Sequence, residues 1–245
     1  MKNNVSIEWL EEVDSTMNEV LREEGRLGDL SVIAAVNQTA GRGQRGNKWL
    51  VEKGTNLTFS ILRKFDPGQF HVSRQFWLNE ATALGIYDYL ADEGVGCSIK
   101  WPNDIYRGNK KICGTLIENT LQGQSVVRSV IGIGLNVNQR SFPSNLVNPT
   151  SMSIVTGKRY SLDKELVKLC DCLLARYGDE SLDSTKAEFE RRLFRFGQSH
   201  EYVDCSTGDT FVGTIEGVTD SGQLIVRTKI GELKEFAFKE ISYII

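Results

Sequence analysis

The stretch GRGQRGNKW, residues 41–49, decides between several folds for this chain. Its letters satisfy the pattern G-x-G-x-x-G, which in dinucleotide-binding folds is a turn that opens a helix. The residues after Gly46 carry no apolar stripe of helical period and include Gly54, so they predict no helix. A P-loop is excluded as well, because Asn47 stands where that motif has lysine. The stretch is therefore predicted to be a glycine-rich loop between two strands.

The side chains of this loop suit an anionic ligand. Arg42 and Arg45 offer planar guanidinium groups that match carboxylate and phosphate oxygens. The glycines let the backbone approach a ligand closely and adopt positive φ. The alternative interpretation is a mobile surface loop, in which glycines and charges are common. Taken alone, this stretch leaves both interpretations open.

Hydrophobic periodicity predicts strands and helices in alternation, followed by strands alone. A helix is predicted to begin at Ser15 or Thr16, where Thr16 and Glu19 have the spacing of a capping box. A long amphipathic helix is predicted over 72–93, and Ser161 is placed to cap another helix. The other predicted elements are strands at 6–12, 31–37, 56–64, 97–101, 104–107, 111–120 and 125–138, and a charged helix at 184–195.

The pattern changes near residue 195, after which short strands alternate with turns. The Asp-Ser-Gly turn at 220–222 is typical of a hairpin. We therefore expect two domains, residues 1–195 and a small β-barrel at residues 196–245.

The composition excludes several classes of protein. With 29 Lys and Arg against 32 Asp and Glu, the formal charge of -3 gives no basic excess for coating nucleic acid. The 5 cysteines lack the C-x-x-C spacing of zinc and redox sites, which favours reduced thiols. No apolar run has the length of a signal peptide or a membrane span, so we expect a cytoplasmic protein without a membrane partner.

Three further stretches carry polar residues at the ends of predicted strands. In IKWPNDIY, Asn103 and Asp104 can supply oxygen ligands to Mg²⁺, although Pro-Asn also forms a simple turn. In NKKICGTLIE, Lys111 precedes Gly114 by three residues, yet a solvated lysine is common in such a place. In VIGIGLNVN, Asn136 follows glycines that are also typical of a β-bulge. Each stretch therefore has a structural explanation beside the functional one.

Taken together and in this order, five stretches resemble the biotin protein ligases. They are DSTMNE, NQTAGRGQRGNKW, KWPNDIY, KKICGTLIE and IGIGLNVN, and the resemblance is close over residues 9–138. The later stretches GTIEGVTDSGQLIV and FKEISYI resemble the terminal barrel of these ligases. The resemblance implies an α+β fold: a catalytic domain made of a mixed β-sheet with helices packed on it, followed by a small SH3-like β-barrel.

Ligases of this family join biotin to a protein lysine, with ATP as second substrate and Mg²⁺ as cofactor. Biotin's carboxylate attacks the α-phosphate of ATP to give biotinyl-AMP, and a lysine of a biotin carboxyl carrier protein then attacks this anhydride. Two anions must meet in the first step, so the site needs fixed positive charge. The resemblance assigns that catalytic charge to Arg42 and Lys111. Its Lys-x-x-Gly spacing selects Lys111 over Lys110, which points to the opposite strand face.

The resemblance also implies binding residues. Ser15, Thr16 and Gln38 match the residues that hold biotin's ureido ring, and Asp104 matches a position near Mg²⁺. The full biotin-binding set is Ser15, Thr16, Gln38, Gly41, Arg42, Gly43, Gln44, Lys111 and Gly114. The nucleotide-binding set is Arg45, Trp49, Asn103, Asp104 and Asn136.

One position departs from the family pattern. The common loop is Gly-Arg-Gly-Arg, and this chain has Gln44 in place of the second arginine. This predicts weaker or altered retention of biotinyl-AMP. The loop at 41–49 itself is predicted to be a lid that shields the intermediate from water.

Two other functions remain as alternatives. Lipoate and octanoate ligases or transferases share the catalytic fold but lack the KWPND pattern as it stands here. Some biotin ligases repress transcription through an N-terminal helix-turn-helix module, for which the eight residues before Trp9 leave no room, so no DNA partner is expected. A catalytically weak biotin sensor stays open. The resemblance also leaves a homodimer open, because the sheet of these ligases often dimerises.

Overall fold

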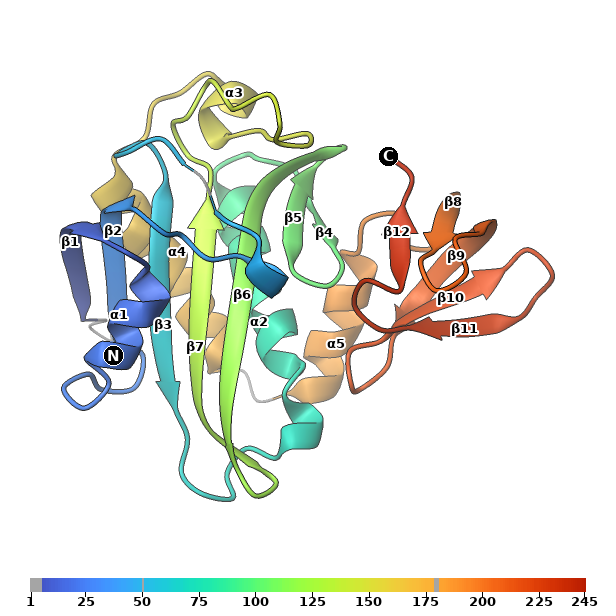
Figure 1. The fold of residues 1–245 in the computed structure, drawn as a ribbon, viewed down its shortest axis with the longest axis horizontal. Helices are drawn as coiled ribbons and strands as arrows, with labels where there is room; N and C mark the ends of the chain where they lie inside the picture. The colour runs from blue at the N-terminus through green and yellow to red at the C-terminus, as the bar shows by residue number, and fades with distance from the viewer. Residues whose placement is uncertain (1–5, 50, 179–180) are drawn as a thin grey trace.

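The computed structural model of the protein describes residues 6–49, 51–178 and 181–245, with the side chain of Arg45 outside the described part. Within these residues the chain forms two β-sheets, with helices packed around the first (Figure 1). The first sheet contains β1 (Ile7–Val13), β2 (Val32–Gln38), β3 (Leu57–Lys64), β4 (Ser98–Lys100), β5 (Asp104–Arg107), β6 (Lys110–Gln122) and β7 (Ser125–Leu135). The second contains β8 (Ser199–Asp204), β9 (Thr210–Val218), β10 (Leu224–Thr228), β11 (Leu233–Phe236) and β12 (Ile241–Tyr243). The α-helices are α1 (Thr16–Arg22), α2 (Trp77–Asp92), α3 (Met152–Thr156), α4 (Leu162–Tyr177) and α5 (Leu182–Arg191).

The first sheet is mixed, as the sequence predicted. Its strand order is β1-β2-β3-β7-β6-β5-β4, with β1 parallel to β2 and the other pairs antiparallel. The long ladder between β6 and β7 places Gly114 opposite Gly134 and Cys113 opposite Leu135. Two glycines therefore face each other near the end of the central strands, and this leaves a gap in the side-chain layer there.

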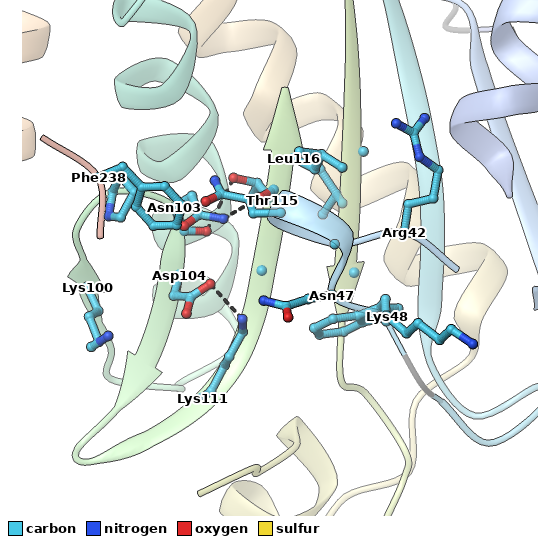
Figure 2. A pocket seen from close by; sticks show the side chains of 18 of the residues that line it. Arg42, Asn47, Lys48, Lys100, Asn103, Asp104, Lys111, Thr115, Leu116 and Phe238 are labelled. Atoms are coloured by element: carbon cyan, nitrogen blue, oxygen red, sulfur yellow. Dashed lines mark hydrogen bonds and ion pairs between the residues drawn. The ribbon is translucent and has the colours of Figure 1, made fainter. Parts of the chain in front are cut away.

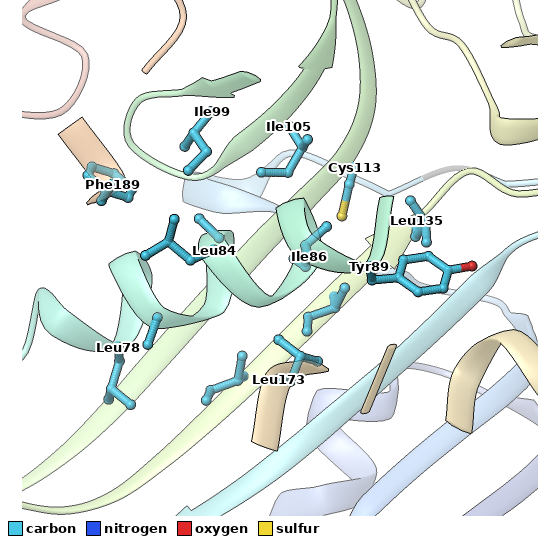
Figure 3. Close-up of a cluster of buried hydrophobic side chains, with 14 of the residues drawn as sticks. Leu78, Leu84, Ile86, Tyr89, Ile99, Ile105, Cys113, Leu135, Leu173 and Phe189 are labelled. Atoms are coloured by element: carbon cyan, nitrogen blue, oxygen red, sulfur yellow. The ribbon is translucent and has the colours of Figure 1, made fainter. Parts of the chain in front are cut away.

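Helix α2 crosses one face of this sheet and is buried on nearly all sides. It begins at Trp77, because 72–74 form a separate 3-10 turn. Residues 80–86 are all buried, since α4 and α5 cover the side of α2 that faces away from the sheet (Figures 1 and 3). Gly85 permits the close approach of α4, because a β-carbon there would lie 2.9 Å from the Cα of Leu173. The helix predicted over 72–93 is thus confirmed for Trp77–Asp92, but its predicted start at 72 and its predicted amphipathic character were wrong.

Helix α1 lies on the opposite face of the first sheet. Met17 and Val20 of α1 form a small core with Ile33 of β2. The neighbours of Ile33 along β2, Val32 and Ala34, belong instead to the large core beneath α2. Because successive side chains of a strand point to opposite faces, one sheet supports both cores.

The capping box predicted at the start of α1 was wrong. Ser15 occupies the N-cap position, but its side chain makes no capping hydrogen bond. The Thr16 hydroxyl donates instead to Gln38 Oε1 at 3.1 Å, and Glu19 accepts from Arg22 at 2.6 Å. A tertiary contact therefore engages Thr16, and an ion pair within the helix engages Glu19, so neither side chain caps the first turn.

The second sheet is antiparallel, with the order β11-β10-β9-β8-β12. The turn at 220–222 joins β9 to β10 and confirms the predicted hairpin. Among the described strands, no pairing joins β11 to β12, so the sheet is consistent with an SH3-like domain but is not a closed barrel. Tyr202 and Ile215 of this sheet continue the large core beneath α2.

All five cysteines are free, and Cys113 and Cys170 are buried. In the part of the chain that the structure describes, no helix is both long and apolar enough to cross a membrane.

Candidate functional site

A cavity of about 280 Å³ lies over β6 and β7, between loop 41–49 and the second sheet (Figure 2). Segments that are far apart in the sequence meet around it. The predicted site residues that line it are Ser15, Thr16, Gln38, Arg42, Gly43, Gln44, Trp49, Asn103, Asp104, Lys111 and Gly114.

Lys111 of β6 lines this cavity. Its Nζ lies 2.7 Å from Asp104 Oδ1 on the facing strand β5 and 5.7 Å from the ring centroid of Trp49. A β-carbon at Gly114 would lie 3.0 Å from Lys111 Nζ, so glycine leaves the space in which this side chain lies. The Lys-x-x-Gly spacing thus has a steric reason. Lys110, by contrast, is exposed and does not line the cavity.

Arg42 enters the cavity from the other side, and its guanidinium group is engaged there. Nη2 forms an ion pair with Glu118 of β6, and Nη1 donates to Asn18 Oδ1 at 3.2 Å. Figure 2 shows the Arg42 side chain directed away from the pair formed by Lys111 and Asp104. The two predicted catalytic cations share a cavity but do not meet at one point in this structure.

Uncharged polar side chains form the end of the cavity next to α1. Gln38 Oε1 accepts from the Thr16 backbone N at 2.8 Å and from Thr16 Oγ1 at 3.1 Å. Thr16 Oγ1 also lies 2.8 Å from the hydroxyl of Ser60, a residue of β3 that no sequence motif singled out. Ser15 Oγ is buried and has no hydrogen-bond partner. A buried hydroxyl without a partner is costly, which favours a ligand with polar atoms at this end.

Loop 41–49 folds back on itself over the cavity. The Trp49 N donates to Gly41 O at 3.0 Å, and the Gly43 N donates to Asn47 O at 2.8 Å. A β-carbon at Gly41 would lie 2.5 Å from Trp49 O, so only glycine allows this close approach. Gly41 shapes the loop without lining the cavity itself.

The indole ring of Trp49 lies across Gly134 of β7. A β-carbon at Gly134 would lie 2.2 Å from the Cε2 atom of that ring. The gap left by the facing glycines of β6 and β7 is therefore partly filled by this aromatic side chain. Its Nε1 is buried and has no hydrogen-bond partner.

Three predicted residues are placed differently from the rest. Asn136 is buried beside β7, donates from Nδ2 to Thr150 O at 2.9 Å, and does not line the cavity. Its side chain holds the chain after β7 in place, so its position gives no support to a contact with nucleotide. Asn103 lines the cavity while its Nδ2 donates to Thr115 O. The side chain of Arg45 lies outside the described residues.

The cavity is strongly basic. Among its described lining residues the acid is Asp104, whereas the cations are Arg42, Lys48, Lys100, Lys111 and Lys239. Sequence analysis missed Lys100 and Lys239 as lining residues, and it missed the contribution of the second sheet altogether. Lys100 lies inside the KWPND motif, which was the available signal for it. An excess of positive charge in a partly enclosed cavity suits a polyanion.

The profile of the Biotin/lipoate A/B protein ligase family matches residues 9–136. The biotin–[acetyl-CoA-carboxylase] ligase of Paracoccus denitrificans is 30% identical over 236 residues, which cover 91% of this chain and 94% of that protein. The bifunctional ligase/repressor BirA of Bacillus spizizenii is 29% identical over 211 residues, which cover 84% of this chain. The match spans only 64% of the length of that relative.

Among solved structures, the biotin protein ligase of Aquifex aeolicus in complex with biotin and ATP is similar to this chain. It superposes with a TM-score of 0.75 at 26% sequence identity, covering 97% of both chains. The length of the profile match and the identity to the Paracoccus relative together settle the family. The chain belongs to the biotin/lipoate A/B protein ligase family.

Proposed function

We propose that this protein biotinylates a lysine of a biotin carboxyl carrier protein, in a reaction that consumes ATP and passes through biotinyl-AMP. The observation that carries the proposal is the composition of one cavity. It is lined both by uncharged hydroxyl and amide groups, at Ser15, Thr16 and Gln38, and by several cations that include Lys111. The names of the relatives and of the Aquifex complex support biotin and ATP as the two small substrates.

In the first step a biotin carboxylate oxygen forms a bond to the α-phosphorus, and the bond to the β-phosphate breaks to release pyrophosphate. Negative charge gathers on the α-phosphate oxygens as the two anions approach. Lys111 is well placed to offset this charge, because it lines the cavity that would hold both substrates. For Arg42 to help, its guanidinium group has to exchange or share its partner Glu118 with the ligand.

In the second step the neutral amine of the acceptor lysine attacks the acyl carbon of biotinyl-AMP. The amide bond forms, the bond between the acyl carbon and the phosphate oxygen breaks, and AMP leaves. Lys111 and Arg42 again face a phosphate that gains charge as it departs. Loop 41–49 covers the cavity, and this would protect the anhydride from water.

Asp104 is the residue that would hold Mg²⁺, which accepts carboxylate and phosphate oxygens as ligands. In the described part of the chain, no group of three or more His, Cys, Asp or Glu is gathered for a metal ion. Asp104 is the acid among the described residues that line the cavity, so most ligands of the ion would have to come from the phosphates of ATP. This fits an Mg²⁺ ion that binds together with the nucleotide. When bound, Mg²⁺ would neutralise phosphate charge, while Asp104 also orients the Lys111 ammonium group through their ion pair.

We also propose that the chain divides into a catalytic domain, residues 1–195, and an SH3-like domain, residues 196–245. The two separate sheets support this division, since the segment from α5 to β8 links them. The shared core at Tyr202 and Ile215 supports a fixed association of the two domains rather than a flexible one.

The test is exchange of labelled pyrophosphate into ATP, run with biotin and, in parallel, with lipoate. Exchange that requires biotin, followed by transfer of label to a biotin carboxyl carrier domain, is the expected result. Exchange that occurs with lipoate and not with biotin would instead identify the protein as a lipoate ligase. Tight binding of biotin without exchange would indicate a sensor.

A further inference from the structure

A second cavity, of about 240 Å³, lies where the end of β3 meets the start of α2 and the end of α4. In Figure 1 the end of β3 and the start of α2 lie at the lower edge of the first sheet. Four aromatic residues line this cavity, together with Arg63, Arg74, Gln69 and Leu182. Among the described residues, none lines both this cavity and the one proposed for catalysis, and no acid lines this one. Its lining is therefore cationic and aromatic.

Arg63 is the buried cation of this second cavity. Its side chain is 12% exposed, and its Cζ lies 5.0 Å from the ring centroids of both Phe65 and Tyr177. Nε donates to Asp29 Oδ1 at 3.2 Å, whereas Nη1 is buried and has no hydrogen-bond partner. Two rings and one carboxylate thus hold the guanidinium group in place, while part of its capacity to donate is unused. A buried donor without a partner is costly, and more so when it is charged.

The neighbours of Arg63 in the lining are donors as well. The indole Nε1 of Trp77 is buried and has no hydrogen-bond partner. Gln69 Oε1 accepts from the Asp66 N at 3.1 Å, which leaves the amide nitrogen of Gln69 as the donor. Arg74 is exposed and forms no ion pair within the described part of the chain. A ligand that satisfies this set of donors is an acceptor with negative charge.

The aromatic residues favour a flat apolar body on that anion. The rings of Phe65 and Phe70 stack with their centroids 4.8 Å apart, and Phe70 meets Trp77 edge to face at 5.9 Å. Such pairs stabilise one arrangement of the rings beyond the burial of their area, so this wall is formed in advance. Sites for small molecules combine apolar walls of this kind with a few polar groups that fix the orientation of the ligand.

We propose that this second cavity binds a small organic carboxylate with an aromatic body. The carboxylate accepts from Arg63, with the indole Nε1 of Trp77 as a second donor, and Arg74 adds positive charge. The body of the ligand packs against the rings of Phe65 and Phe70. This site is separate from the cavity proposed for catalysis, and it does not depend on the proposed function.

The probe is phenylacetate, titrated into isotope-labelled protein and followed by NMR through the Nε1–H resonance of Trp77. Trp77→Phe assigns this resonance among those of the 4 tryptophans. Phenylacetate is expected to shift the resonance saturably. Phenylacetamide, which lacks the charge, and acetate, which lacks the ring, are each expected to bind at least about ten-fold more weakly. The absence of a saturable shift with phenylacetate, or equal affinity for either analogue, overturns the proposal.

Three arginine variants test where the probe binds. Arg63→Gln is expected to weaken phenylacetate binding by about ten-fold or more, the value of one hydrogen bond to a charged group. Arg74→Gln changes an exposed side chain and is expected to weaken binding several-fold with the fold unchanged. The matched control is Arg159→Gln, at an exposed arginine that lines neither cavity, and it should bind phenylacetate as the parent does.

Parental affinity in Arg63→Gln, or an equal loss in Arg159→Gln, overturns the proposal. If Arg63→Gln does not fold, Arg74→Gln decides alone, and parental affinity in that variant is then the contradicting result. The titrations contain neither biotin nor ATP, so their outcome is distinct from that of the pyrophosphate exchange assay.

Discussion

At the scale of single residues, Lys111 and Lys110 are adjacent in sequence and differ entirely in surroundings. Lys111 pairs with Asp104 in the cavity, and Lys110 is exposed. Lys111→Ala is expected to lower the rate of biotin-dependent pyrophosphate exchange by about 100- to 1000-fold, as for the loss of one transition-state donor. Lys110→Ala is the matched control and should change the rate little. Similar losses from both variants would show that the assignment of the catalytic amine to Lys111 rather than Lys110 is wrong.

Gln44 is the position at which this chain departs from its family pattern. It lines the cavity, and its Oε1 is buried without a partner. Gln44→Arg adds a cation beside the site of the adenylate, so the variant is expected to release biotinyl-AMP several-fold more slowly. The measurement is the dissociation rate of labelled biotinyl-AMP after dilution into unlabelled intermediate. An unchanged dissociation rate would show that this position does not contact the intermediate.

At the scale of elements, most strands were predictable because each carries its own local pattern. Alternation, turn residues and β-branched runs marked β1, β2, β3 and the hairpin from β9 to β10. The predictions that failed depend on distant partners. Helix α2 is buried on most of its sides because α4 and α5 cover it, and the Thr16 hydroxyl of α1 donates to Gln38 of β2. Such contacts have no local signature.

The same principle applies to the candidate site. The lining residues of loop 41–49 and of β6 could be predicted, because their motifs are compact in sequence. The lining position of Lys239 could not be predicted, since it depends on the docking of the second sheet rather than on neighbours in the chain.

The buried environment of α2 has a consequence for pH. Burial raises the pKa of Glu80 from 4.5 to about 7, and Glu190 and Asp220 raise it while Lys186 lowers it. Between these two pH values the folded state holds a proton that the unfolded chain releases, so stability falls as pH rises from 4.5 toward 7.

Glu80→Gln removes this loss of stability at higher pH, because glutamine stays uncharged. At pH 8 the variant is expected to be more stable than the parent by at most about 3 kcal/mol, with little difference at pH 4.5. The measurement is the melting temperature as a function of pH, with the exposed Glu11→Gln as control. A difference that does not depend on pH would contradict the assignment.

At the scale of the whole molecule, the cavity exists only because the two sheets are docked. Trp101 Nε1 donates to Gly222 O across their boundary, whereas Trp77 Nε1 is buried without a partner. Trp101→Phe therefore loses a hydrogen bond that Trp77→Phe does not, and it should cost about 1 kcal/mol more in unfolding free energy. Chemical denaturation of both variants measures this difference. Equal losses would mean that this hydrogen bond does not help to hold the sheets together.

The claim on which the account depends is that Arg42 and Lys111 act on one ligand, although here they point apart. The most direct test is a crystal structure of the protein with biotinyl-AMP. The account predicts that Arg42 leaves Glu118 and that both side chains lie within about 3.2 Å of oxygens of the anhydride or its phosphate. A complex in which Arg42 still pairs with Glu118, and only Lys111 touches the ligand, would contradict it.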